Sequence, residues 1–171
     1  ADNIILSCGS SSASFPGLTP DGDAVLDSTG VLNLPEVPES LIIVGAGAIG
    51  LELGDFFGMM GSKITIVEAA PHIAPTEDAD IAKEMDRVQS KAGRTCITGV
   101  MAKSLVTKDG QAELTLGDGR VLTASKALVA VGRTPNTAGL NCEKAGCTLK
   151  RRGFVDVNDH LEAAEGVYAI G

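Results

Sequence analysis

Three glycines at positions 45, 47 and 50 follow the apolar run 41–44, and the acidic residue Glu68 comes eighteen positions after the last of them. In a strand–turn–helix setting, the first glycine permits a tight turn and the second lets a pyrophosphate approach the backbone. The third lets the helix pack close to the strand. The free N–H groups and positive dipole end of that helix favour phosphate. The spacing therefore predicts a dinucleotide-binding turn.

The residues on either side of this turn have the patterns of the elements that must position it. The run 41–44 predicts a buried strand, Gly61 ends the helix that follows the turn, and 63–67 predicts the next strand. The expected buried face of the helix is Ile49, Leu53, Phe56, Phe57 and Met60. Glu68 then falls at the carboxyl end of the second strand, where a carboxylate accepts hydrogen bonds from the adenosine ribose. The alternative is a structural glycine turn beside a solvated strand-end glutamate.

Glu68 also bears on the choice of cofactor. A 2′-phosphate would bring negative charge against this carboxylate and would need an arginine nearby, yet the first arginine after Glu68 is Arg87. NAD is therefore predicted rather than NADP.

Composition limits the class of protein. The 171 residues, 44% of them hydrophobic, are enough for one domain with a substantial core. A net charge of −8 without a basic cluster argues against nucleic acid and against an anionic membrane as partners. No apolar run is long enough for a membrane span, and no charged segment followed by an apolar run is found among the first residues, so no signal peptide is expected. A cytoplasmic protein is expected.

A second amphipathic helix and a third strand are expected after the first two strands. The apolar residues of this helix recur at helical spacing, at Ile81, Met85, Val88 and Ala92. Lys91 and Gly93 mark its end. Residues 95–97 are expected to form a third parallel strand beside the first two.

The pattern changes between residues 101 and 122, where no helical periodicity is found. Two Asp-Gly pairs, 109–110 and 118–119, predict hairpin turns and hence a three-stranded meander. Residues 128–131 then predict a return to the centre of the sheet. The expected fold class is α/β, a Rossmann-like parallel sheet with helices on both faces and a three-stranded antiparallel β-meander insertion.

Taken together, these segments resemble a known family. The motifs that carry the resemblance are 45–52 (GAGAIGLE), 67–68 (VE), the β-meander, 131–136 (VGRTPN) and 167–171 (VYAIG). They are similar to the flavin-dependent pyridine nucleotide-disulfide oxidoreductases, and within that family to the dihydrolipoamide dehydrogenases. The resemblance implies oxidation of dihydrolipoamide with reduction of NAD through FAD in the intact enzyme.

The resemblance also implies a division of the chain. Residues 1–37 are expected to be an FAD-domain junction and linker, 38–150 the NAD-binding domain, and 151–171 a returning, truncated FAD-domain junction. FAD and C-terminal dimerisation domains belong to the intact chain. The resemblance implies that the intact chain forms a homodimer, and it allows docking to a 2-oxo acid dehydrogenase complex. No catalytic residue is expected in these 171 residues, which should bind nucleotide and reduce nothing.

Individual positions match family residues that contact the cofactors. In the family, the equivalents of Ala48 and Ile49 line the path to the nicotinamide, and a carboxylate like Glu52 contacts its carboxamide end. Met101 matches a backbone contact to adenine and Gly132 a glycine that admits the nicotinamide ribose. The expected NAD-binding residues are Gly45, Ala46, Gly47, Ala48, Ile49, Gly50, Glu52, Glu68, Met101 and Gly132. Gly9 and Ser10 match the flavin-contacting turn, although Ser7-Cys8 stands where Ala-Thr is usual.

Cysteine and histidine positions suggest no further chemistry. Cys142 and Cys147 have the spacing of the family's redox-active pair but lie in the wrong part of the chain, and Cys147 suits a small apolar slot. Cys8 and Cys96 are expected to be core thiols, and no metal site is predicted because no Cys-x-x-Cys spacing occurs. The two histidines, His72 and His160, are interpreted as solvated loop residues.

Three alternatives remain open. The chain could be the NAD domain of a related NADH oxidase or mercuric-reductase-like enzyme. It could be a non-catalytic NAD-sensing module, which shares the glycine turn but does not need the flanking motifs. It could also be a methyltransferase that binds S-adenosylmethionine, although such enzymes usually lack the 132–136 motif.

Overall fold

The computed structural model describes all residues from 1 to 171, and these divide into two compact units. The larger unit comprises residues 14–132, and the smaller unit comprises 1–13 with 133–171. These bounds differ from the expected segments 1–37, 38–150 and 151–171. The reason is that residues 14–37 add a strand and a helix to the larger unit, while the segment after 132 pairs with the N-terminal segment. Which segment serves which cofactor remains a prediction.

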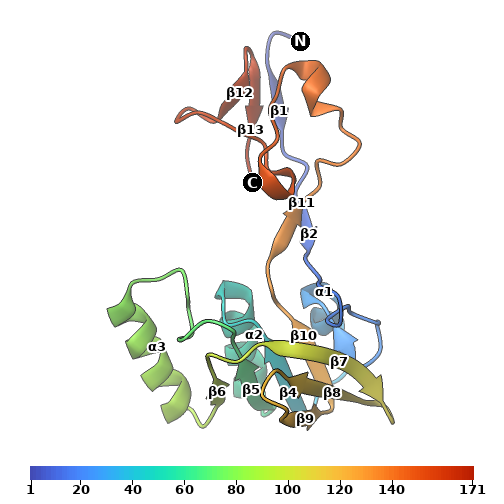
Figure 1. Cartoon of the computed structure of the whole chain (residues 1–171), viewed down its shortest axis with the longest axis vertical. Coiled ribbons are helices and arrows are strands. Elements are labelled where there is room, and N and C mark those ends of the chain that lie inside the picture. The colour runs from blue at the N-terminus through green and yellow to red at the C-terminus, as the bar shows by residue number, and fades with distance from the viewer. The chain divides into compact units, whose positions relative to one another are not determined.

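The larger unit is built on a five-stranded parallel sheet (Figure 1). Its strand order is β3 (Val25–Leu26), β10 (Lys126–Val129), β4 (Ser40–Val44), β5 (Lys63–Val67) and β6 (Thr95–Ile97). The strands are rich in Val, Ile and Leu because a parallel sheet is covered on both faces. The expected order of the first three strands and the central place of β10 are confirmed.

The two faces of this sheet are covered by different structures. One face packs against residues of three helices, α1 (Ser28–Leu32), α2 (Ala48–Met59) and α3 (Ala79–Lys91). The other packs against an antiparallel meander, β7 (Ala102–Lys108), β8 (Gln111–Leu116) and β9 (Val121–Ala124). The α/β class, the parallel sheet and the meander are confirmed. The helices differ from the expectation in sharing one face, because the meander already covers the other.

The buried faces of both long helices overlap only partly with the expected ones: Phe57 is buried, and Leu53 and Met85 are partly buried. In α2 the buried residues are Gly50, Leu51, Gly54 and Phe57, whereas Phe56 is 46% exposed and Met60 is 55% exposed. A Cβ at Gly54 would lie 2.9 Å from Ile43 Cδ1, so the contact face includes glycines that a hydrophobic pattern does not register. In α3, Ala82 and Gln89 are buried while Ile81 and Val88 are exposed. Gln89 is buried because its amide oxygen accepts a hydrogen bond from Arg94.

A hydrogen-bonded carboxylate joins the start of β3 to the meander. Asp21 accepts hydrogen bonds from the Thr107 hydroxyl and from the backbone N–H groups of Asp23 and Val25. Burial by itself raises the pKa of Asp21, but these hydrogen bonds outweigh it and hold the pKa below its ordinary value of 3.8.

This lowered pKa predicts how stability depends on pH. The hydrogen bonds of Asp21 stabilise the fold fully above the unfolded-state pKa, and this contribution is lost as pH falls through the lower folded-state value. We expect Asp21→Asn to reduce stability at neutral pH and to flatten the loss of stability below about pH 4. Urea unfolding of both proteins between about pH 6 and pH 3 checks this. The prediction would be contradicted if the free energies of unfolding of the two proteins fell in parallel as the pH was lowered.

The smaller unit is a separate β structure. Its first sheet has the order β1 (Ile4–Leu6), β13 (Val167–Ala169), β12 (Glu162–Ala164), and β2 (Ser10–Ser12) pairs with β11 (Arg133–Pro135). Two 3₁₀ turns, η1 (Cys142–Ala145) and η2 (Arg151–Gly153), complete it. None of the helices in either unit has the length and apolarity needed to span a bilayer.

The cysteines are placed partly as expected. Cys8 is exposed and lies between β1 and β2, so its expected role as a core thiol is wrong: the strand ends two residues before it. Cys96 is half-buried in β6. Cys142 and Cys147 are buried together.

Candidate functional site

The glycine turn joins β4 to α2 at the carboxyl edge of the sheet. Gly45 has φ +106°, and a Cβ there would overlap the Ala130 carbonyl at the end of the neighbouring strand. A Cβ at Gly50 would overlap the Gly45 carbonyl oxygen. Both positions therefore require glycine for the turn to close and for α2 to start beside β4.

Gly47 differs from its two neighbours because it faces open space. It is the N-cap of α2, has extended backbone angles, and a Cβ there would meet nothing within 4 Å. No side chain caps the helix, so the N–H groups of its first turn are available to an acceptor from outside the chain. An anion placed in this space would face those N–H groups and the positive end of the helix dipole.

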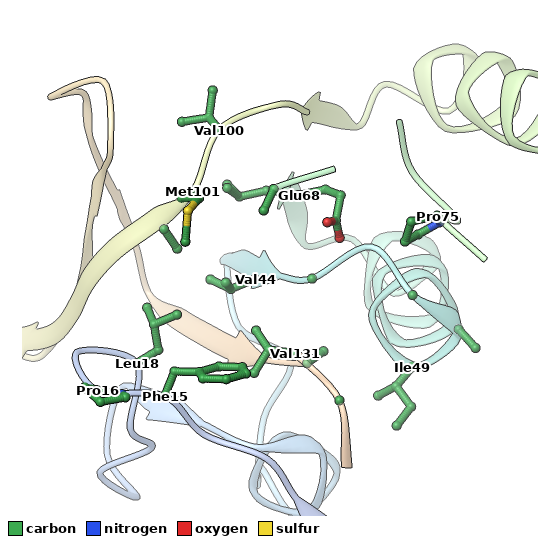
Figure 2. A pocket seen from close by; sticks show the side chains of 18 residues that line it. Phe15, Pro16, Leu18, Val44, Ile49, Glu68, Pro75, Val100, Met101 and Val131 are labelled. Atoms are coloured by element: carbon green, nitrogen blue, oxygen red, sulfur yellow. The ribbon is translucent and has the colours of Figure 1, made fainter. Parts of the chain in front are cut away.

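Glu68 follows β5 and links two segments at the same edge. One carboxylate oxygen accepts the N–H of Ala46 at 2.7 Å, and the other accepts the N–H of Ala70 at 2.8 Å. Figure 2 shows this carboxylate turned toward the backbone that follows Val44. Each carboxylate oxygen can accept about two hydrogen bonds, so both keep capacity for hydroxyl donors. The side chain therefore orients the turn and still presents acceptors.

A cavity of about 660 Å³ opens at this edge of the sheet, a volume suited to a small organic ligand. Figure 2 shows Phe15, Pro16 and Leu18 grouped at one end and Ile49 and Pro75 at the other. Glu68 is the only charged residue among those that line the cavity, and most of the others are apolar. The cavity therefore has apolar walls, one anionic group and one helix N-terminus.

The structure brings most of the expected NAD-binding residues to this cavity. Seven of them line it: Gly45, Gly47, Ala48, Ile49, Glu68, Met101 and Gly132. Ala46 and Gly50 are buried behind the turn, where they shape it. Glu52 is exposed one turn into α2 and is not among the lining residues. His72, in the loop after β5, is exposed, as is His160 in the smaller unit.

The lining residues that sequence patterns did not identify include Phe15, Pro16, Leu18 and Pro75. The Pro16-Gly17 pair is a turn signal, and Gly17 does have φ +84°. What holds the turn in place is distant in sequence, since Leu105 of β7 donates its N–H to the Gly17 carbonyl at 2.8 Å. A Cβ at Gly17 would lie 2.8 Å from the Lys103 carbonyl, so this approach also needs glycine.

Gly9 and Ser10 lie in the smaller unit, where they line a separate cavity of about 350 Å³. The Gly9 carbonyl accepts the N–H of Asn136 at 3.0 Å. Arg133 donates to the Ser10 hydroxyl at 2.7 Å and to the Ser10 carbonyl. The 7–10 segment is therefore hydrogen-bonded to the 132–136 motif, a pairing that the sequence did not predict, while contact with a flavin remains a prediction.

Comparison with known proteins gives consistent matches along the whole chain. The family model for pyridine nucleotide-disulphide oxidoreductases matches residues 1–171. Leghemoglobin reductase of Glycine max is 39% identical over 175 residues, which cover 99% of this chain and 34% of the relative. Mitochondrial dihydrolipoyl dehydrogenase of Pisum sativum is also 39% identical over 175 residues, with 99% and 35% coverage.

Solved structures agree with these matches. LpdA from Mycobacterium tuberculosis has a TM-score of 0.90 at 32% identity, covering 100% of this chain and 38% of that chain. The chain spans about a third of the length of the curated relatives it matches.

Proposed function

The chain belongs to the pyridine nucleotide-disulphide oxidoreductase family, and we propose on this basis that its larger unit binds NAD(H) in the 660 Å³ cavity. The observation that carries the proposal is the open space at Gly47, directly before the uncapped N-terminus of α2. A pyrophosphate needs this arrangement, namely a backbone without a side chain in the way and N–H groups to receive its charge.

The rest of the cavity fits the two ends of a dinucleotide. Glu68 would accept the ribose hydroxyls while it holds the Ala46 and Ala70 N–H groups. Apolar residues on both sides of the cavity, among them Val100, Met101 and Val131, offer apolar surface against which the adenine and nicotinamide rings can pack. We assign Met101 to the adenine end and Gly132 to the nicotinamide end, following the family resemblance, and Glu52 to the carboxamide end although it lies outside the cavity lining.

Charge supports NAD over NADP. No lysine, arginine or histidine is among the residues that line the cavity, and its single charged residue is anionic. A 2′-phosphate beside the Glu68 carboxylate would meet like charge with no cation to offset it. The dinucleotide without this phosphate is therefore the favoured ligand.

For the intact protein we propose a flavoprotein of the dihydrolipoyl dehydrogenase type, in which Gly9 and Ser10 lie on the FAD side. The support is the sequence identity of 39% and 40% to two enzymes of that name, over nearly the whole chain. Bound NAD would supply a nicotinamide that exchanges hydride with the flavin. The larger unit would bind the NAD and orient its nicotinamide. A homodimer, and docking to a 2-oxo acid dehydrogenase complex, belong to the same proposal.

Calorimetric titration of the chain with NADH, NADPH and S-adenosylmethionine tests the proposal. We expect one NADH per chain and at least about tenfold weaker binding of NADPH, which corresponds to about 1.4 kcal/mol. Binding of S-adenosylmethionine without NADH would contradict the nucleotide assignment. A preference for NADPH would contradict the role of Glu68.

A further inference from the structure

Two cysteines lie at the ends of one tight turn in the smaller unit. The turn is η1, which ends at Gly146 in the left-handed conformation with φ +80°. The N–H of Cys147 donates to the Cys142 carbonyl at 3.1 Å, and the N–H of Gly146 donates to the Glu143 carbonyl at 3.1 Å. This double pattern is a Schellman motif, in which the side chains at the two ends are frequently in contact.

The backbone bond limits how far apart the two cysteines can be. With standard bond lengths, an N···O distance of 3.1 Å keeps the Cα atoms of Cys142 and Cys147 within about 7 Å of each other. Disulfides form at Cα separations of about 4.4 to 6.8 Å. The turn therefore keeps the two Cα atoms at or close to separations at which a disulfide can form.

The side chains share one environment. Cys142 is 3% exposed and Cys147 is 4% exposed, and both belong to the small core of this unit with Val167. Burial raises the pKa of the Cys147 thiol, and the neighbouring Cys142 and Glu143 add to the effect. Both thiols are free in the structure.

We propose that Cys142 and Cys147 are a modification site, a dithiol that closes to an intramolecular disulfide by exchange with small disulfides such as oxidised glutathione. In the first step one cysteine thiolate attacks the reagent, forming a mixed disulfide and releasing one thiolate of the reagent. The second cysteine thiolate then attacks the mixed disulfide at the protein sulfur and releases the other half. The two cysteines lose two electrons and two protons, and the reagent becomes two thiols.

The turn gives the reagent a route to these buried sulfurs. Residues 143–146 between the cysteines are all exposed, and they are held by local backbone bonds only one turn long. Opening of such a short surface segment costs far less than global unfolding. Because the attacking species is the thiolate, the rate of closure should rise with pH through the alkaline range.

A tryptic map gives a direct test, because Lys144 lies between the two cysteines. The chain is treated with oxidised glutathione, denatured in the presence of iodoacetamide so that every remaining thiol is blocked, and digested. We expect the peptides 134–144 and 145–150 to be recovered joined, with a mass lower by two hydrogen atoms than their sum, and to separate on treatment with dithiothreitol. Glutathionylation of exposed Cys8 serves as the internal measure of reagent activity.

The variant Cys147→Ser isolates the second step. It should abolish the joined peptides and leave glutathione attached to Cys142 as the stalled mixed disulfide. Cys8→Ser should leave the joined peptides unchanged. The proposal is overturned if Cys8 becomes glutathionylated while Cys142 and Cys147 are both recovered alkylated. It is also overturned if either of them pairs mainly with Cys8 or Cys96.

Discussion

Gly50→Ala is expected to destabilise the larger unit by about 4 kcal/mol or more, which places it among the most damaging single substitutions. The new methyl group would overlap the Gly45 carbonyl oxygen and press on Ile43, and both neighbours are fixed, one by the turn and the other by the sheet. This overlap can be relieved only if α2 moves away from β4. Urea unfolding followed by circular dichroism measures the loss. A destabilisation below about 1 kcal/mol would show that the helix shifts easily.

Gly47→Ala is the matched control within the same turn. Its backbone angles suit alanine and a Cβ meets nothing within 4 Å, so stability should change by no more than about 1 kcal/mol. NADH affinity should nevertheless fall at least about tenfold, because the methyl group occupies the space assigned to the pyrophosphate. Unchanged NADH affinity in a folded Gly47→Ala protein would contradict that assignment.

Glu68→Gln is expected to have the second largest effect, on binding and on cofactor choice. An amide offers one oxygen where the carboxylate offers two, so either the Ala46 or the Ala70 N–H loses its acceptor. The turn should lose about 1 to 2 kcal/mol and the NADH affinity at least about tenfold. Removal of the charge should also narrow the preference for NADH over NADPH. Titration with both nucleotides measures each effect.

Glu36→Gln removes one negative charge from an exposed position of the same unit and is the control for net charge. It should leave the affinities for NADH and NADPH, and their ratio, within about twofold of the original. If Glu36→Gln and Glu68→Gln changed the ratio equally, the discrimination would come from overall charge and not from the cavity.

Sequence patterns predicted well those features that local chemistry decides. The glycine turn, the strand that precedes Glu68 and the two Asp-Gly hairpins all occur as expected, because each depends on residues close together in the chain. The continuous apolar runs correctly indicated central parallel strands.

The features that were missed depend on packing between distant segments. The contact face of α2 includes Gly50 and Gly54, whose lack of a side chain lets the helix approach the sheet, so apolar periodicity selected the exposed Phe56 and Met60 instead. The meander occupies a face that helices were expected to cover. Phe15 reaches the cavity through a turn held by β7, and nothing near Phe15 in the sequence indicates that partner.

The most direct test of the proposed function is to locate bound NAD by NMR. In ¹H–¹⁵N spectra of the labelled chain, NAD should shift the amide signals of residues 45–50, together with those of Ala70 and Met101, while signals from 133–171 stay in place. A titration that moves signals of the smaller unit alone, or that leaves the amides of the glycine turn unchanged at saturation, would contradict the assignment of this cavity to the nucleotide.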